Sequence, residues 1–437
     1  MDPLTLGLLA LGAALLGTMI GVPVAISLGL TGLVGLWGVG GFTLVTTTLE
    51  TLPHDALSDY SFVVIPMFIL MGVLASHAKV TNDIYEACYR FMAHVKGSLY
   101  MVTVISSAGF ATISGSTIVS SAVFTRLALP EMIRFGYNPG LSAGCIAAAG
   151  TFATLIPPSI MMVIYALLTG ESIGRLLIAG AIPGFLTAAV YLAALWGLVR
   201  MRPQLSSPLE KRFTWPERRQ SLTKVGPFVI LSVVVIGGIY TGLIFPSSAG
   251  AVGAIGALAL AVWRGVAQPG KIQSCLNDTA STAAALFLVL LGGLLFSRYL
   301  VFSGFIFDAV DFITDSGIAP WQVLMLIIIG NLILGMFIDT VSITVVTVPF
   351  IHPIIVGLGY DPIWFGILLI KLVEISAITP PVGLNLFAVM AASDGKVETG
   401  DLFRGVLPFL LLELLVLLAL LTFPDLSLWL PRLVLGS

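Results

Sequence analysis

The chain contains an internal repeat that relates residues 223 positions apart. Five of the twelve prolines in the first half have a proline partner at this offset. Average proline usage, at roughly 5% of residues, predicts fewer than one such match. The repeat therefore spans most of each half and indicates one architecture used twice. The proline pairs are Pro23 and Pro246, Pro130 and Pro353, Pro139 and Pro362, Pro157 and Pro380, and Pro158 and Pro381.

Composition places both halves in a membrane. Charged residues make up 10% of the chain, against roughly 25% in soluble domains, and the mean hydropathy is +1.07. Continuous apolar runs such as 4–20, 226–244 and 405–422 are long enough to cross a bilayer as helices. A β-barrel would show short alternating segments instead. The first run follows no basic region and precedes no small-residue cleavage site, so we interpret it as a retained span rather than a signal peptide.

Cysteine and histidine predict no metal site. Cys88, Cys145 and Cys275 are scattered without metal-ligand spacing, and we interpret them as small buried apolar residues. The four histidines form no cluster in the sequence. A net charge of −2 does not point to any class of partner.

Basic residues orient the chain. They are concentrated in the segment 201–223 that joins the repeats, which we expect to be cytoplasmic. Five crossings and one re-entrant hairpin in each half then invert the second repeat and leave both termini on the external side. On this topology sixteen of the twenty Lys and Arg residues are cytoplasmic and three are external. The bases of the linker and its flanks are Arg200, Arg202, Lys211, Arg212, Arg218, Arg219 and Lys224.

The predicted fold class is an all-α polytopic membrane protein with an inverted repeat, two re-entrant helical hairpins and two broken transmembrane helices. The first repeat, 1–200, comprises scaffold helices within 4–77, an arm helix at 79–95, a hairpin at 97–134, a broken helix at 139–169 and a scaffold helix at 174–200. The second, 224–437, comprises spans at 224–244, 246–266 and 280–300, a hairpin at 320–355, a broken helix at 362–392 and a span at 403–423. External loops are expected at 47–60 and 301–318.

In two segments the apolar residues have the spacing that is typical of an amphipathic helix. In 79–95 the apolar residues recur on one face, and 303–315 shows a similar pattern with three aspartates on the other face. Either these are arms that hold a moving domain, or they are ordinary interfacial connectors.

Four interruptions of the helices are predicted at membrane depth, where free backbone groups need protein, water or a ligand. The first is the hairpin tip at 109–117, rich in Gly, Ser and Thr, whose carbonyls and hydroxyls could converge on a cation. A close helix–helix contact would favour the same small residues. The second is Pro157-Pro158, which frees carbonyls near Thr154 for a bound Na⁺, a water or a neighbouring side chain. Residues 335–340 and 378–383 are their repeat partners.

Three charged residues near the interruptions of the second repeat are candidates for function. A carboxylate at membrane depth is costly, so Asp339 is predicted to bind a cation or to hold the hairpin backbone. Lys371 and Glu374 are three residues apart on one helix and can pair with each other. Alternatively, Lys371 helps to hold an anionic substrate.

At these motifs the sequence resembles the large membrane subunit of tripartite ATP-independent periplasmic (TRAP) transporters, the DctM-like family. The resemblance covers nearly the whole chain, and more distantly the hairpins resemble those of sodium–dicarboxylate elevator transporters of the ion-transporter superfamily. The motifs of the first half are Ser114-Gly-Ser116, Pro130-Glu-Met132, Phe135-Gly-Tyr137, Ala147-Ala-Ala-Gly-Thr151, Ile156-Pro-Pro-Ser159 and Gly180-Ala-Ile-Pro-Gly184. Those of the second half are Asp339, Leu358-Gly-Tyr360, Phe365-Gly366 and Thr379-Pro-Pro-Val-Gly-Leu-Asn385.

The resemblance implies Na⁺-coupled uptake of a small organic acid across the bacterial inner membrane, with two or more Na⁺ ions and no ATP. It implies two partners, a small four-helix membrane subunit and a soluble periplasmic substrate-binding protein. At 437 residues we expect no fused small subunit. The implied Na⁺ residues are Ser114, Gly115, Ser116, Thr154 and Pro157 in one site, and Gly335, Asp339, Thr379, Pro380 and Gly383 in another. The expected substrate-binding residues are Ser116, Thr117, Ser159, Thr340, Lys371 and Asn385, with the substrate between the hairpin tips.

Two departures from the family pattern stand out. Ser247-Ser-Ala-Gly250 replaces a segment that often carries Glu, and Lys371 stands where an uncharged polar residue is expected. A channel that reuses polar hairpins is the main alternative function, although four matched interruptions fit alternating access better. An enzyme is not expected, because no nucleophile–base or metal motif accompanies the polar tips.

Overall fold

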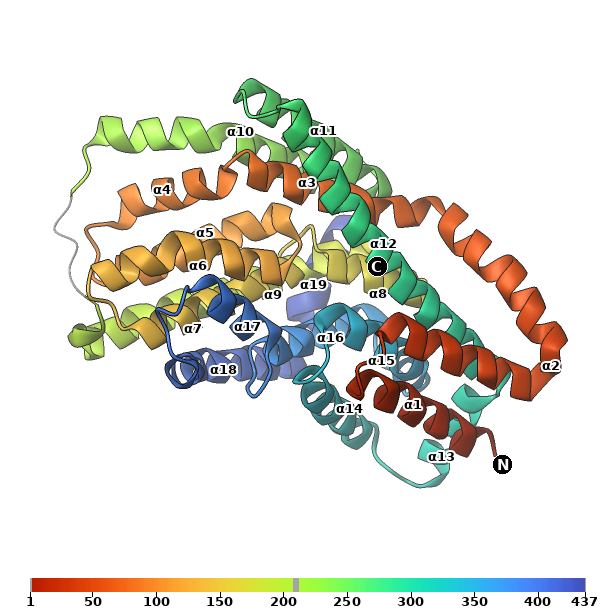
Figure 1. Cartoon of the computed structure of the whole chain (residues 1–437). Helices are drawn as coiled ribbons and strands as arrows, with labels where there is room; N and C mark the ends of the chain where they lie inside the picture. The colour runs from red at the N-terminus through yellow and green to blue at the C-terminus, as the bar shows by residue number, and fades with distance from the viewer. Residues whose placement is uncertain (1, 207–211, 437) are drawn as a thin grey trace.

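The computed structural model describes residues 2–206 and 212–436, and its regular structure in these ranges is helical (Figure 1). Lys211, one of the expected linker bases, lies outside the described residues. Within them, eight helices are long and apolar enough to cross a membrane. The chain is therefore a multi-pass helical membrane protein.

The first half begins with three apolar helices and then passes through a short amphipathic helix into two interrupted helical pairs. Its α-helices are α1 (Pro3–Met19), α2 (Val24–Ser58), α3 (Val64–His77), α4 (Val80–Met92), α5 (Ser98–Ser114), α6 (Thr117–Arg134), α7 (Pro139–Gly150), α8 (Ile160–Thr169) and α9 (Ile173–Met201). Short 3-10 helices are η1 (Tyr60–Val63), η2 (Thr151–Thr154) and η3 (Pro203–Leu205).

The second half repeats this order of elements and adds one helix at its end. Its helices are α10 (Trp215–Tyr240), α11 (Pro246–Trp263), α12 (Pro269–Phe302), α13 (Phe305–Asp315), α14 (Pro320–Gly335), α15 (Thr340–Gly357), α16 (Pro362–Ala377), α17 (Leu384–Ala392), α18 (Thr399–Thr422) and α19 (Asp425–Leu435).

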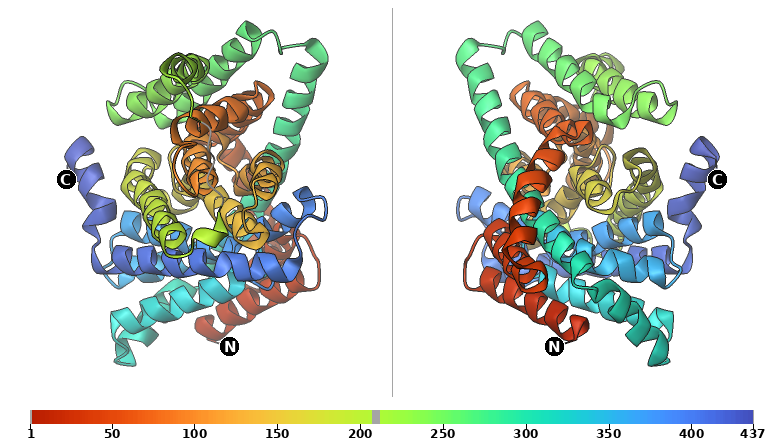
Figure 2. Two further views of the ribbon diagram at one scale, coloured as in Figure 1. Left: turned by 90° about the vertical axis from the view of Figure 1, so that its left-hand side faces the viewer. Right: turned by 90° about the vertical axis from the view of Figure 1, so that its right-hand side faces the viewer.

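Packing between the halves follows the repeat. Helix α2 packs against α12 and α3 packs against α11, so the second and third helices of each half exchange partners. In the same way α6 packs against α17 and α15 against α8. Figures 1 and 2 show α3, α10, α11 and α12 along one side of the molecule, with the interrupted helices α5 to α8 and α14 to α17 grouped beside them.

The amphipathic helix α4 lies between two groups of helices. It packs against α5 on one side and α10 on the other. Asp83 of α4 forms an ion pair of 2.6 Å with Arg264, which follows α11 and also donates to the carbonyl of Ala78. The segment is thus tied to both groups, as either an arm or a connector would be.

The prediction of a loop at 47–60 is wrong, because helix α2 continues to Ser58. Gly41 has φ +67° and divides the helix at a kink, which glycine tolerates because it has no Cβ. Beyond the kink, threonine hydroxyls donate to carbonyls one turn earlier, as in Thr47 to Thr43 and Thr51 to Thr47. The threonine hydroxyls thus find hydrogen-bond acceptors within the helix, and the helix continues past them.

Two other boundaries also differ from expectation. Helix α10 begins at Trp215, inside the segment expected to be a linker, where Thr214 and Glu217 form a capping box. Helix α12 begins at Pro269 rather than near 280, because a proline in the first turn is compatible with a helix start.

Helix α9, which was expected in the scaffold, packs mainly against α19 and also contacts α5, α8, α16 and α18. Gly180 and Gly184 allow this close approach, since a Cβ at either position would lie 2.8 Å from Leu155 O or from Ile156 Cγ1 respectively. These glycines place α9 directly against the first interruption, which local hydropathy could not reveal.

A glycine contact between α7 and α18 gives the first prediction. A Cβ on Gly144 would collide with the Gly405 backbone and lie 2.7 Å from Val406 N. Gly144→Ala is expected to destabilise the protein by about 1–3 kcal/mol through overpacking. The melting temperature in detergent checks this against Gly197→Ala, where a Cβ meets nothing within 4 Å. Equal melting temperatures for the two variants would contradict the close contact.

Candidate functional site

The first hairpin turns at Gly115 and Ser116. Gly115 has φ +56°, a conformation that favours glycine, and ends α5. The Ser116 hydroxyl caps α6 by accepting from Val119 N at 3.4 Å. Ser114, just before the turn, contacts the Ser120 hydroxyl at 2.9 Å. The tip therefore presents hydroxyls at the N-terminal, positive end of α6.

The second hairpin uses a carboxylate at the equivalent place. Asp339 lies 223 residues after Ser116 and caps α15. Its Oδ2 accepts from Val341 N at 3.1 Å and from Ser342 N at 3.0 Å. Asp339 thus holds the hairpin backbone, one of its two expected roles, and its Oδ1 is the oxygen that a cation could contact.

The first interruption lies against the first hairpin. The 3-10 helix η2 packs on both α5 and α6. Ser159 caps α8 and donates its hydroxyl to the carbonyl of Thr154. The carbonyl freed by Pro157-Pro158 is therefore satisfied by a neighbouring side chain in this structure. The Thr154 hydroxyl is 2.7 Å from Glu374 Oε1, across the repeat boundary.

The second interruption lies against the second hairpin. A Cβ on Gly335 would collide with the Ser376 side chain, so the tip approaches α16 closely. The Thr379 hydroxyl donates to Ile375 O at 2.6 Å. Gly383 has φ +50° and precedes α17, and Pro380 lies half-buried between them. Each expected set of Na⁺-binding residues thus consists of residues from a hairpin tip and from the interrupted helix of the same repeat.

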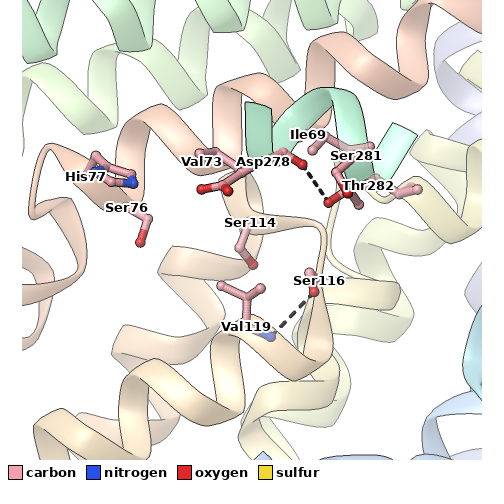
Figure 3. Close-up of a pocket in the computed structure, with 12 residues that line it drawn as sticks. Ile69, Val73, Ser76, His77, Ser114, Ser116, Val119, Asp278, Ser281 and Thr282 are labelled. Atoms are coloured by element: carbon pink, nitrogen blue, oxygen red, sulfur yellow. Dashed lines mark hydrogen bonds between the residues drawn. The ribbon is translucent and has the colours of Figure 1, made fainter. Parts of the chain in front are cut away.

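A cavity of about 450 Å³ opens beside the first hairpin tip (Figure 3). Ser114 and Ser116 lie on one side of it, and α3 and α12 form the other. Asp278 and His77 are its titratable side chains among the described residues. Its remaining polar lining consists of the hydroxyls of Ser76, Ser281 and Thr282.

The expected substrate-binding residues differ in their exposure and in whether they line this cavity. Ser116 lines the cavity. Thr117, Ser159 and Asn385 are buried, and Asn385 donates to Ala147 O at 3.3 Å. Thr340 lies half-exposed in the second hairpin, whose described residues do not line this cavity. The cavity therefore involves one hairpin tip and not the space between both tips.

Lys371 does not line this cavity. Its side chain is 0% exposed, and its ammonium lies 2.8 Å from Glu374 Oε2 and 3.0 Å from the Thr187 hydroxyl. It also pairs with Glu413, which accepts from the Tyr191 hydroxyl. The expected pairing with Glu374 is thus part of a larger network. The signal that could have indicated Glu413 is that it is the one acid within the apolar run 405–422.

Known proteins share the sequence pattern and the architecture of this chain. A family model for the DctM component of tripartite ATP-independent periplasmic transporters matches residues 11–426. The chain is 32% identical over 395 residues to the C4-dicarboxylate TRAP transporter large permease protein DctM of Pseudomonas aeruginosa, covering 89% of each chain. It is 31% identical over 382 residues to the sialic acid TRAP transporter large permease protein SiaM of Vibrio cholerae, covering 87% of this chain and 88% of the relative.

The fold itself is shared more widely. Over 97% of this chain and 95% of the other, it resembles the structure of MtrF of Neisseria gonorrhoeae, an antimetabolite efflux pump, with a TM-score of 0.59 at 14% identity. Structural likeness at this identity shows the fold alone. The match of the family model along nearly the whole sequence goes further, and the chain belongs to the DctM component family of tripartite ATP-independent periplasmic transporters.

Proposed function

We propose that this large permease carries a small organic anion inward, coupled to Na⁺. The observation that carries the proposal is the equivalence of Ser116 and Asp339, which cap the second helix of each hairpin 223 residues apart. Each tip adjoins a proline-interrupted helix of its own repeat, where backbone oxygens and hydroxyls gather. Oxygen ligands of this kind suit a hard monovalent cation.

Alternating access is proposed to follow an elevator mechanism in an inverted repeat. One group of helices would be the frame, formed by α2, α3, α11 and α12, which pair across the halves. The other would move, and it contains both hairpins, both interrupted helices, α9 and α18, which pack on one another. Na⁺ bound at the tips would satisfy free backbone oxygens and so lower the cost of passing the site through apolar surroundings.

The substrate class is proposed from the cavity and the relatives. Serine hydroxyls at the N-terminus of α6 can donate to a carboxylate, and the helix dipole favours the negative charge there. The two relatives are named for C4-dicarboxylate and sialic acid transport. Both named substrates are carboxylates, which fits a small organic acid as cargo.

Partners and location follow from the family. A TRAP large permease acts with a small membrane subunit and a periplasmic substrate-binding protein. We propose that both are separate chains here, that the permease lies in the bacterial inner membrane, and that its basic linker faces the cytoplasm.

Uptake in proteoliposomes tests the proposal. Vesicles would contain this chain with its small subunit, and the binding protein loaded with a C4-dicarboxylate or sialic acid would be supplied outside. We expect saturable uptake that needs both the binding protein and an inward Na⁺ gradient. Reversing the gradient should reverse net flux. Uptake that is indifferent to Na⁺ would refute the coupling, and non-saturating flux would favour a channel.

Gly72 offers a test of movement between frame and hairpin. It lies on α3, and a Cβ there would be 2.9 Å from Ile113 O and 3.0 Å from Ser114 O. Gly72→Ala is expected to overpack this conformation by about 1–3 kcal/mol and to lower the maximal uptake rate roughly tenfold. The rate is measured against Gly38→Ala, whose Cβ would meet nothing within 4 Å. Equal rates for both variants would count against a sliding contact at this tip.

A further inference from the structure

A buried charge network links the two repeats next to the first interruption. Lys371, Glu374 and Glu413 are each 0% exposed. Thr187 and Tyr191 of α9 complete it from a third helix and are also fully buried. Removing charged groups from water costs several kcal/mol for each ion, and apolar residues of similar size often hold helices together as well or better. Intramembrane charges are therefore a functional hypothesis by default.

Glu374 divides its two oxygens between two tasks. Oε2 lies 2.8 Å from the Lys371 ammonium, which fixes the orientation of the carboxylate. Oε1 is left for the Thr154 hydroxyl at 2.7 Å. Among the charged members of the network, Glu374 is the one that reaches the interruption, whereas Glu413 turns its other oxygen to Tyr191.

The Thr154 hydroxyl has one hydrogen and two acceptors within reach. Glu374 Oε1 is at 2.7 Å and Thr151 O is at 2.8 Å. A carboxylate is the stronger acceptor, so the hydrogen points to α16 of the other repeat. Because the Thr154 carbonyl also accepts from Ser159, both polar groups of Thr154 are held in one orientation.

We propose that Glu374 is a positioning residue for the first Na⁺ site. It does not touch the ion but sets the orientation of Thr154, while Lys371 holds the carboxylate in place. The inference rests on the proposed Na⁺ coupling and adds that the second repeat determines the geometry of the site in the first. The apparent affinity for Na⁺ should then depend on which way the Thr154 hydroxyl points.

Glu374→Gln reverses that hydrogen bond with little change in shape. Lys371 can only donate, so the amide must turn its oxygen to the ammonium and its NH₂ group to Thr154. Thr154 then accepts instead of donating, and its hydrogen moves to Thr151 O. The variant leaves one buried ammonium against one carboxylate, Glu413, so the network keeps paired charges.

Glu413→Gln is the matched control. It removes the same charge by the same isosteric change and leaves Lys371 paired with Glu374. Its amide oxygen would face Lys371 and its NH₂ group would face the Tyr191 hydroxyl, which can accept. The Thr154 hydrogen bond is not altered.

The experiment measures the half-saturating Na⁺ concentration of uptake, the KM for substrate and the melting temperature with and without Na⁺. For Glu374→Gln we expect the half-saturating Na⁺ concentration to rise at least fivefold, with KM at saturating Na⁺ within twofold of wild type. For Glu413→Gln we expect the Na⁺ value to stay within twofold. Thr154→Val should reproduce the Na⁺ shift while keeping every charge of the network, and Thr154→Ser, which keeps a hydroxyl, should have a half-saturating Na⁺ concentration close to that of wild type. Combining Glu374→Gln with Thr154→Val should add no further shift, because both act through one hydroxyl.

Three outcomes would overturn the inference. If wild-type uptake and melting temperature ignore Na⁺, the proposed coupling fails and this inference fails with it. If the wild type responds to Na⁺ but the two glutamine variants shift equally, the coupling stands and Glu374 has only a structural role. If Glu374→Gln does not fold, Thr154→Val decides, and an unchanged Na⁺ value there refutes the positioning of Thr154.

Discussion

Asp339→Ala is expected to lower Na⁺-dependent uptake by at least 100-fold. The substitution removes both hydrogen bonds that Oδ2 accepts from Val341 N and Ser342 N at the tip of the second hairpin. Losing such a cap costs about 0.5–2 kcal/mol of local stability. The same change removes the carboxylate proposed to face the ion, and a charge-assisted contact of this kind adds about 2 kcal/mol. Initial uptake rates at a fixed inward Na⁺ gradient measure the loss.

Two companion variants separate the cap from the charge. Asp361→Ala removes an equivalent cap at the start of α16. There Asp361 Oδ1 accepts from Ile363 N at 2.8 Å and from Trp364 N at 3.0 Å. We expect it to lower stability and leave Na⁺ dependence unchanged. Asp339→Asn keeps a capping oxygen and loses the charge, so it should retain the fold but need more Na⁺. Activity of Asp339→Ala close to that of Asp361→Ala would move the cation away from Asp339.

Lys371→Met is expected to be the most destabilising single substitution in the buried core. It leaves the carboxylates of Glu374 and Glu413 facing each other without the ammonium that each contacts. Removing one partner of a buried ion pair costs about 3–5 kcal/mol, because a charge is left uncompensated. The melting temperature and the yield of monodisperse protein in detergent should both fall sharply.

Compensating changes provide the control for this prediction. Lys371→Met combined with Glu374→Gln and Glu413→Gln leaves no charge in the network and should recover most of the lost stability. Arg432→Ala breaks an exposed pair with Asp425, in which Arg432 is 56% exposed, and should cost less than about 1 kcal/mol. If Lys371→Met melts like Arg432→Ala, the network is not a paired set of buried charges.

Local backbone chemistry explains why much of the architecture was predictable. Two consecutive prolines interrupt a helix, as at Pro157-Pro158 and Pro380-Pro381, and glycine permits a turn with positive φ, as at Gly115. These constraints act within a few residues, so the positions of both tips and both interruptions could be predicted from sequence. Apolar runs long enough for a bilayer likewise fix which segments are membrane helices.

Hydropathy did not reveal two features of the structure. Gly180 and Gly184 bring α9 against the first interruption, which is a contact between distant segments. The segment 47–60, expected to be a loop, is helical to Ser58, and its threonine hydroxyls donate to carbonyls one turn earlier. Hydropathy is an average over many consecutive residues, so it carries no information about which neighbour a given side chain contacts.

The duplicated helical membrane architecture and the four interruptions could be predicted from the residues alone, because paired prolines, glycine and apolar length act locally. Long-range packing sets the contacts of Glu374 with Thr154, 220 residues away, and of Glu413 with Tyr191, 222 residues away. It also decided that Lys371 is enclosed rather than open to the cavity. Partners so distant are chosen by how helices pack, and the cost of burying an unpaired charge then selects the arrangement in which every charge meets its partner.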